Sequence, residues 1–169
     1  MRLNKDEAEK KYPNVVFVGN SFWIYEGAVI CEGAIICEVA RICEGARIYE
    51  GATICEGATI CEGAIIYAGA VIYEGATICE GATICEGARI CKGATNVRDC
   101  IVILGIGNTK KITAYNSKKG VRIVIGCFEG NIQQAYNVIN KKYPDVNHPY
   151  HSALAMIERH YKLLNGVRE

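Results

Sequence analysis

The most regular feature of the chain is a six-residue pattern of apolar and polar positions that runs from Ile24 to Thr95. Twelve consecutive hexads follow the form I-[CY]-E-G-A-x without insertion. Ile holds the first position and Ala the fifth in all twelve, whereas Gly at the fourth is replaced once, by Val39. A period of six fits neither a helix of about 3.6 residues per turn nor an uninterrupted strand. The pattern predicts a short strand and a turn, repeated along the chain.

Within each repeat, the segment A-x-I-[CY] predicts which side chains face inward. Residues alternate between the two faces of a strand, so Ala and Ile share one face and the other two residues share the opposite one. The following Glu-Gly pair predicts a corner, because Gly tolerates the backbone angles of a sharp turn. The repeat thus predicts a prism with Ile and Ala inside, in which a large residue at an Ala position overpacks the interior.

The signature of an aliphatic residue, two further residues and a small one resembles the hexapeptide-repeat proteins, whose fold is a left-handed parallel β-helix. Three hexads form one triangular coil in that fold, so the resemblance implies about four coils. The expected fold class is mainly β, with the β-helix followed by a small α+β domain of a three-stranded antiparallel sheet and two helices. We expect an N-terminal capping helix and entry strand over residues 1–23, the β-helix over 24–97 and a basic α+β domain over 98–169.

Outward positions eighteen residues apart fall into columns, and these columns are rich in Val, Ile, Tyr and Cys. Apolar stripes of this extent are uncommon on a monomer. The resemblance implies a homotrimer with prism faces packed together, and we expect that contact along these stripes.

Eight of the ten cysteines occupy the second position of a hexad. In-register neighbours stand about 4.8 Å apart with parallel side chains, which disfavours disulfides, and C-x5-C spacing sends successive thiols to different faces, which disfavours zinc. A redox role stays open, but small apolar fillers of a subunit contact are the preferred interpretation. The charged N-terminus shows no secretory signal and no long apolar run exists, so reduced thiols in a cytoplasm are expected, without a membrane partner.

The repeats contain no His between residues 24 and 95. Many hexapeptide-repeat proteins are acyltransferases that use a His as general base beside a coenzyme A thioester, and others resemble gamma-class carbonic anhydrases with a His-bound metal. Both chemistries lose their residue type here. We therefore expect a non-enzymatic protein with no cofactor and no metal. Aligned Thr59, Thr77 and Thr95 keep ice binding open as an alternative, although Cys61, Cys79 and Val97 replace the second half of each T-x-T pair.

After Thr95 the pattern changes to three expected strands, CIVILGIG, KITAYNS and VRIVIGCFEG, followed by two helical stripes. We expect Cys127 to lie in the core of the third strand and His160 to be a partly buried spacer in the last helix. This region resembles the tails of phage and prophage proteins of unassigned function. The matching residues are Ile125, Gly126, Cys127, Phe128, Gly130 and His148, whereas Tyr143-Pro144 stands where those tails have His-Gly.

The near-neutral net charge of +1 hides two opposite halves. Residues 24–95 carry ten Glu against four basic residues, a balance of −6, and residues 98–169 carry eleven Lys or Arg against five acids, a balance of +6. A ring of positive charge attracts small anions and, less favoured here, nucleic acid. The candidate ligand-binding residues lie on expected hairpin tips and before the last helix: Lys110, Lys111, Lys118, Lys119, Arg122, His148, Tyr150 and His151.

The preferred hypothesis from the sequence is a non-enzymatic homotrimer that binds a small anionic ligand, with a phage-encoded protein that sequesters a nucleotide signal as its most specific form. A structural or virion component, or another protein-interaction module, is one alternative. A divergent hexapeptide-repeat acyltransferase is the other, and it requires coenzyme A binding despite the missing His.

Overall fold

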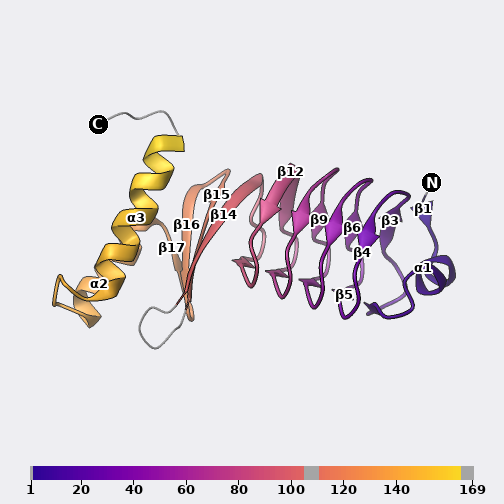
Figure 1. Ribbon diagram of the computed structural model, residues 1–169, viewed down its shortest axis with the longest axis horizontal. Helices are drawn as coiled ribbons and strands as arrows, with labels where there is room; N and C mark the ends of the chain where they lie inside the picture. Colours follow the sequence, from indigo (N-terminus) through magenta and orange to yellow (C-terminus); the bar gives the residue numbers. More distant parts are fainter. Residues whose placement is uncertain (1, 105–110, 165–169) are drawn as a thin grey trace. The chain divides into compact units, whose positions relative to one another are not determined.

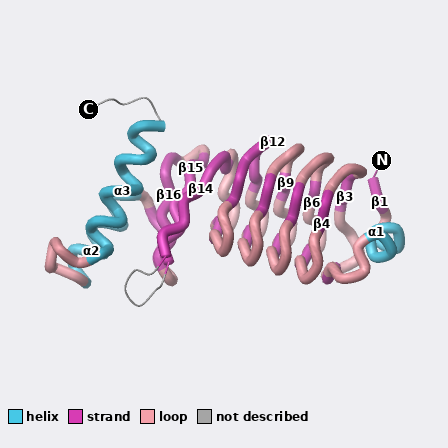
Figure 2. The backbone as a smooth tube through the Cα atoms, viewed as in Figure 1, coloured by secondary structure: helices cyan, strands magenta, loops and turns pink. Residues whose placement is uncertain are grey.

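The computed structural model describes residues 2–104 and 111–164 of the chain, which divides into two compact units, Met1–Cys100 and Ile101–Glu169. The first unit is a β-solenoid, in which short strands separated by turns stack from one coil to the next (Figures 1 and 2). Residues eighteen positions apart pair in parallel, such as Arg41 with Thr59 and Thr59 with Thr77. The six-residue repeat therefore produces three faces, each built from every third hexad.

The strands of the three faces are as follows. The first face contains β3 (Trp23–Tyr25), β6 (Arg41–Ile42), β9 (Thr59–Ile60) and the start of β12 (Thr77–Ile84), which pairs with β14 (Val97–Leu104). The second face contains β4 (Val29–Ile30), β7 (Arg47–Ile48), β10 (Ile65–Ile66) and the end of β12. The third face contains β2 (Val16–Phe17), β5 (Ile35–Ile36), β8 (Thr53–Ile54), β11 (Val71–Ile72) and β13 (Arg89–Ile90).

The solenoid makes about five turns, which confirms the mainly β fold and is consistent with the left-handed β-helix. The expected number of four coils is too small. The additional turn comes from segments outside the hexad signature, because Val16 pairs with Ile35 before the first hexad and Val97 pairs with Ile78 after the last. Backbone pairing needs only extended segments in register, so a strand can join the stack without the repeat sequence.

The interior of the solenoid is a stack of Ile and Ala side chains. From Ala34 to Ile90 every inward Ile and every inward Ala is fully buried, except for Ala82 at 4% exposure. Backbone hydrogen bonds join the coils; for example, the Arg41 amide donates to the Ala58 carbonyl at 2.9 Å. Burial of an aliphatic side chain is worth about 1.5–3 kcal/mol, so the repeated Ile column is the main source of stability in this unit.

The N-terminal end of the solenoid is closed by two elements. β1 (Arg2–Leu3) pairs antiparallel with β3, and α1 (Lys5–Lys11) begins at a capping box formed by Asn4 and Glu7. The Tyr12 hydroxyl, just after the helix, donates a buried hydrogen bond of 2.6 Å to the Ala28 carbonyl. The first coil therefore has its backbone edge and its end partly covered.

The second unit is a small α+β arrangement, as the sequence predicts. β15 (Lys111–Ser117), β16 (Gly120–Ile125) and β17 (Phe128–Gly130) form an antiparallel meander, and β14 is the neighbour of β15. The segment VRIVIGCFEG is not one strand, because Gly126 adopts a positive φ of 58° and turns the chain into a hairpin. Cys127 consequently lies exposed at the turn, and its expected place in the core is wrong.

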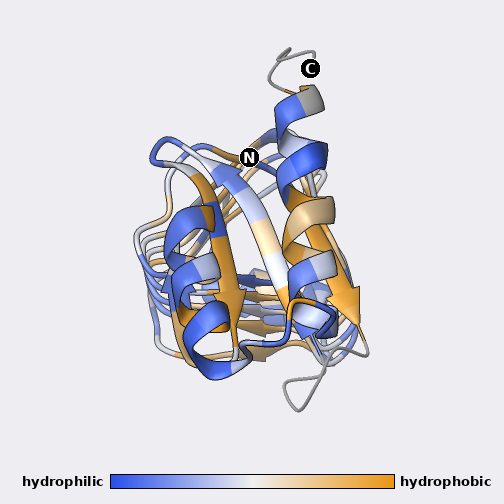
Figure 3. Cartoon of the chain, turned by 90° about the vertical axis from the view of Figure 1, so that its left-hand side faces the viewer, coloured by the Kyte–Doolittle hydropathy of each residue, from blue (hydrophilic) through white to orange (hydrophobic). Residues whose placement is uncertain are grey.

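Two helices cover the meander, α2 (Ile132–Lys142) and α3 (Pro149–Leu164) (Figure 3). Their apolar stripes meet the strands in one core cluster that includes Ile123, Leu154 and Ile157. The Tyr161 hydroxyl donates to the Ala114 carbonyl at 3.0 Å and ties α3 to the middle of β15. Among the helices in the described part of the chain, none has the length and apolar character needed to span a membrane.

One corner of the solenoid holds a residue that is poorly suited to its backbone. Val39 occupies the Gly position of its hexad and adopts a φ of 59°, close to the 65° of Gly57 in the corner one coil above. A β-branched side chain is unfavourable in this left-handed region, whereas Gly enters it without a steric penalty.

Replacing Val39 with Gly is expected to raise the free energy of unfolding by about 1 kcal/mol, because relief of the left-handed strain exceeds the entropy cost of Gly. Urea denaturation measures the change. The reciprocal substitution Gly57→Val should lower stability, and Val71→Gly, in a regular strand, should also lower it. A stability loss in Val39→Gly would contradict the strain at this corner.

Candidate functional site

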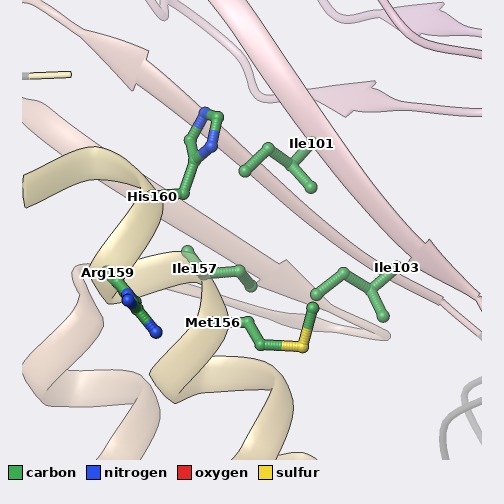
Figure 4. Close-up of a pocket in the computed structure, with 6 residues that line it drawn as sticks. All are labelled: Ile101, Ile103, Met156, Ile157, Arg159 and His160. Carbon is green, nitrogen blue, oxygen red and sulfur yellow. The ribbon is translucent and has the colours of Figure 1, made fainter. Parts of the chain in front are cut away.

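The most developed pocket in the described part of the second unit lies between β14 and α3, with a volume of about 510 Å³ (Figure 4). Ile101 and Ile103 form one wall, because residues two apart on β14 share a face. Met156 and Ile157 of α3 form the opposite wall. The lining is therefore predominantly apolar, which suits a hydrocarbon group more than a compact anion.

The polar groups of the pocket come from one turn of α3. His160 is four residues after Met156, a spacing that places both side chains on the same side of the helix. Figure 4 shows the His160 imidazole beside Ile101, with the Arg159 guanidinium at the edge of the pocket. The ring of Tyr161 meets the imidazole edge-on at 5.1 Å. The helix thus presents a proton acceptor and a cation beside an apolar surface.

His160 is the histidine whose ring is available for chemistry. Its side chain is exposed, and within the described residues no hydrogen bond or ion pair engages either ring nitrogen. The sequence-based expectation of a partly buried spacer is wrong, because the buried stripe of α3 runs through Ala153, Leu154, Ile157 and Tyr161. Finding this residue from sequence would have required knowing that β14 lies against α3.

The other two histidines hold the start of α3. The His151 Nε2 donates to the Tyr143 carbonyl at 2.9 Å, and the His148 Nδ1 accepts from the Tyr150 amide at 3.4 Å. The His148 ring stacks on Tyr143 at 4.2 Å and on Tyr150 at 5.2 Å. Tyr150 itself is 1% exposed. The structure brings these three predicted residues together around Tyr143, where their contacts fix the entry to the helix.

The predicted basic residues do not form one cluster. Lys110 lies outside the described residues, and Lys111 opens β15, whereas Lys118 and Lys119 occupy the turn at its other end. Successive turns of a meander lie at opposite ends of the strands, which puts about 20 Å between the two groups. Arg122 forms an ion pair of 2.9 Å with Glu129 on the neighbouring strand. The expected gathering of hairpin tips is therefore wrong.

A second pocket of about 380 Å³ lies between the β16–β17 turn and α2. It is lined by Cys127, Phe128, Lys142, Tyr143 and buried apolar residues of the same unit. Its opening contains an exposed thiol and a lysine, but no histidine or carboxylate lines it. This pocket offers fewer proton-transfer groups than the pocket at His160.

All ten cysteines are free thiols, and those of the repeat are partly exposed on the outside of the solenoid. Burial is the largest cause that raises the pKa values of Cys37, Cys43, Cys55 and Cys61 above 9.0, and Glu56 and Glu74 raise that of Cys37 further. The thiols therefore stay protonated at neutral pH and serve as apolar outward side chains. Within the described residues, no group of three or more His, Cys, Asp or Glu has the arrangement of a metal site.

No protein-family model matches the chain, and no curated protein matches it. Three solved structures resemble it. The acetyltransferase domain of PglB from Neisseria gonorrhoeae FA1090 in complex with acetyl coenzyme A has 23% identity and a TM-score of 0.42, over 49% of this chain and 37% of that one. The same PglB domain in another structure has 18% identity and a TM-score of 0.25, over 52% and 48%. A proposed acetyltransferase of Bacillus cereus has 14% identity and a TM-score of 0.25, over 82% and 98%.

The match spans less than half the length of either PglB structure. Because the solved structures that resemble the chain are acetyltransferases, they contradict the expectation of a non-enzymatic protein that sequesters an anionic ligand. They give no support to the phage-like origin of the C-terminal region. At these identities the likeness is one of fold, so any activity of this chain has to come from its own residues.

The raised thiol pKa values predict that the solenoid loses stability in alkali. Thiols with a folded pKa above 9.0 stabilise the fold fully below that pH, and the contribution is lost as the pH rises towards the folded pKa, because the unfolded chain ionises first. We expect the melting temperature to fall between about pH 8 and pH 10, and to fall less in Cys37→Ala/Cys55→Ala. Calorimetry across this range is the measurement, with Cys127→Ala as the exposed control. An equal fall in all three proteins would contradict this assignment.

Proposed function

We propose that the chain is a divergent hexapeptide-repeat acyltransferase that moves an acyl group from a coenzyme A thioester to a nucleophilic acceptor. The observation that carries the proposal is the unengaged imidazole of His160 at the mouth of an apolar pocket. Acyl transfer needs a general base near the acceptor and a surface that holds the acyl donor, and this pocket offers both. The sequence resemblance to hexapeptide-repeat proteins supports the same class of reaction.

In the proposed reaction, the apolar walls hold the acyl end of the donor. Ile101, Ile103 and Met156 contact its hydrocarbon portion, and Arg159 at the rim attracts the phosphates of coenzyme A. His160 accepts the proton of the acceptor's hydroxyl or amine as that atom attacks the thioester carbonyl. The C–S bond then breaks, and the same proton passes from the imidazolium to the departing sulfur, which leaves free coenzyme A and the acylated acceptor.

The reaction is tested with acetyl coenzyme A as donor and water as acceptor, with chromatography to measure free coenzyme A. We expect His160→Gln to slow its release about 100-fold or more, since Gln keeps the size of the side chain but cannot take up a proton. Binding of acetyl coenzyme A, measured by calorimetry, should stay within about twofold because Gln leaves the pocket walls intact.

Lys162→Gln is the matched control, because Lys162 lies on the same helix and pairs only with Glu158 among the described residues. Its rate should equal that of the unmodified protein. Full activity in His160→Gln would remove the proposed base, and a lack of both binding and turnover in the unmodified protein would overturn the acyltransferase proposal.

A homotrimer with solenoid faces in contact is part of the proposal, as is a cytoplasmic location that keeps the outward thiols reduced. The second face supports the assembly, since Val29 is 50% exposed, Tyr67 is 39% exposed and the ring of Tyr67 stacks on Tyr49 at 5.2 Å. Neighbouring aromatic and aliphatic groups of this kind are suited to a closed contact between copies.

Light scattering is expected to give three times the chain mass of 18.5 kDa. Val29→Glu/Tyr67→Glu should reduce the mass to that of one chain, because buried carboxylates at a subunit contact lack partners. Lys118→Glu, in the β15–β16 turn, is the control and should leave the mass unchanged. A single-chain mass for the unmodified protein would contradict the trimer.

A further inference from the structure

We propose that Cys85 and Cys100 form a redox-active dithiol pair that closes a reversible disulfide across β12 and β14. The pair lies in the first unit, at the last turn of the solenoid, and its formation does not depend on acyl transfer. It differs from the remaining thiols of the repeat because its two cysteines come from unlike positions. Cys85 belongs to a hexad, and Cys100 follows the last hexad on β14.

Three contacts hold the two cysteines against each other. The Cys85 amide donates to the Cys100 Sγ at 2.8 Å, and the Cys85 Sγ donates to the Cys100 carbonyl at 3.1 Å. A hydrogen bond also joins the two thiols. Each residue thus contacts both the backbone and the side chain of the other, which positions the two sulfurs for direct reaction.

The local pairing explains why the sulfurs meet here. The register between β12 and β14 shifts from Ile78 opposite Val97 to Thr83 opposite Asp99, a change of three residues. The eighteen-residue spacing that keeps the repeat thiols parallel is therefore lost. Whereas Cys43, Cys61 and Cys79 stand in one column with parallel side chains, Cys100 turns inward at 8% exposure beneath the more exposed Cys85.

Their unequal exposure assigns the order of the steps when glutathione disulfide is the oxidant. The Cys85 thiolate attacks one sulfur of glutathione disulfide, which breaks that S–S bond and releases one glutathione. The Cys100 sulfur then attacks the Cys85 sulfur of the mixed disulfide and displaces the second glutathione. The two thiol protons end on the two glutathione molecules, so two protein thiols are oxidised while one disulfide is reduced.

Closing this bond joins positions fifteen residues apart across the final corners of the solenoid. The reduced chain holds β14 against β12 only through backbone pairing and the contacts of Cys85 with Cys100. The disulfide removes conformations of the unfolded chain that the reduced form can reach, which stabilises the last turn. Oxidation is therefore expected to stiffen the point at which the repeat ends.

The test is incubation of the native full-length protein with glutathione disulfide, followed by alkylation of the remaining thiols, intact mass measurement and tryptic mapping. We expect eight alkylated thiols and a disulfide between peptides 48–89 and 99–110, the second of which contains Cys100 as its sole cysteine. The melting temperature should rise by about 5–10 °C and return to its first value after dithiothreitol.

Cys85→Ser and Cys100→Ala should each abolish the link between these peptides, whereas Cys61→Ser, in the same tryptic peptide as Cys85, should retain it. The mapping of the unmodified protein keeps the test decisive if a variant fails to fold. Ten alkylated thiols after oxidation, a link that survives Cys85→Ser, or a disulfide that leaves Cys100 free would each overturn the pair.

Discussion

Every turn of the solenoid depends on one steric requirement, that the Ile and Ala side chains of a coil lie directly against those of the next. Ile42, Ile60 and Ile78 pair in register and are fully buried, so a shift of one residue would turn an apolar interior outward. This requirement fixes the coil at eighteen residues and leaves two inward positions per hexad with almost no freedom. Chemical variety is confined to the outward positions, the corners and the segments beyond the repeat.

The inward and outward alternation could be predicted from the hexads because each residue's surroundings repeat every eighteen positions. The limits of the stack could not, since Val16 and Val97 join it through backbone pairing, to which the hexad pattern is blind. The hairpin at Gly126 was hidden for a related reason. An unbroken run of strand-forming residues gives no sign that one glycine adopts a positive φ and exposes Cys127.

The candidate site shows the same division between local pattern and contact at a distance. Helical spacing alone puts Met156 and His160 on one side of α3, but the pocket exists only because Ile101 and Ile103, more than fifty residues earlier, face them. His148 and His151 carry the more suggestive sequence context, yet their ring nitrogens are occupied in fixing the helix start. In this chain the availability of an imidazole depends on its hydrogen bonds, which a sequence does not display.

The closed first coil has a consequence for how copies of the chain can associate. A parallel ladder whose end is open presents unpaired amides and carbonyls to any identical ladder, and regular, uninterrupted coils are an effective template for end-to-end growth. β1 covers part of that edge by running antiparallel to β3, and the Tyr12 hydroxyl occupies the Ala28 carbonyl. The short N-terminal segment thus acts as a chain terminator that limits a potentially endless repeat to discrete particles and keeps it from forming fibres.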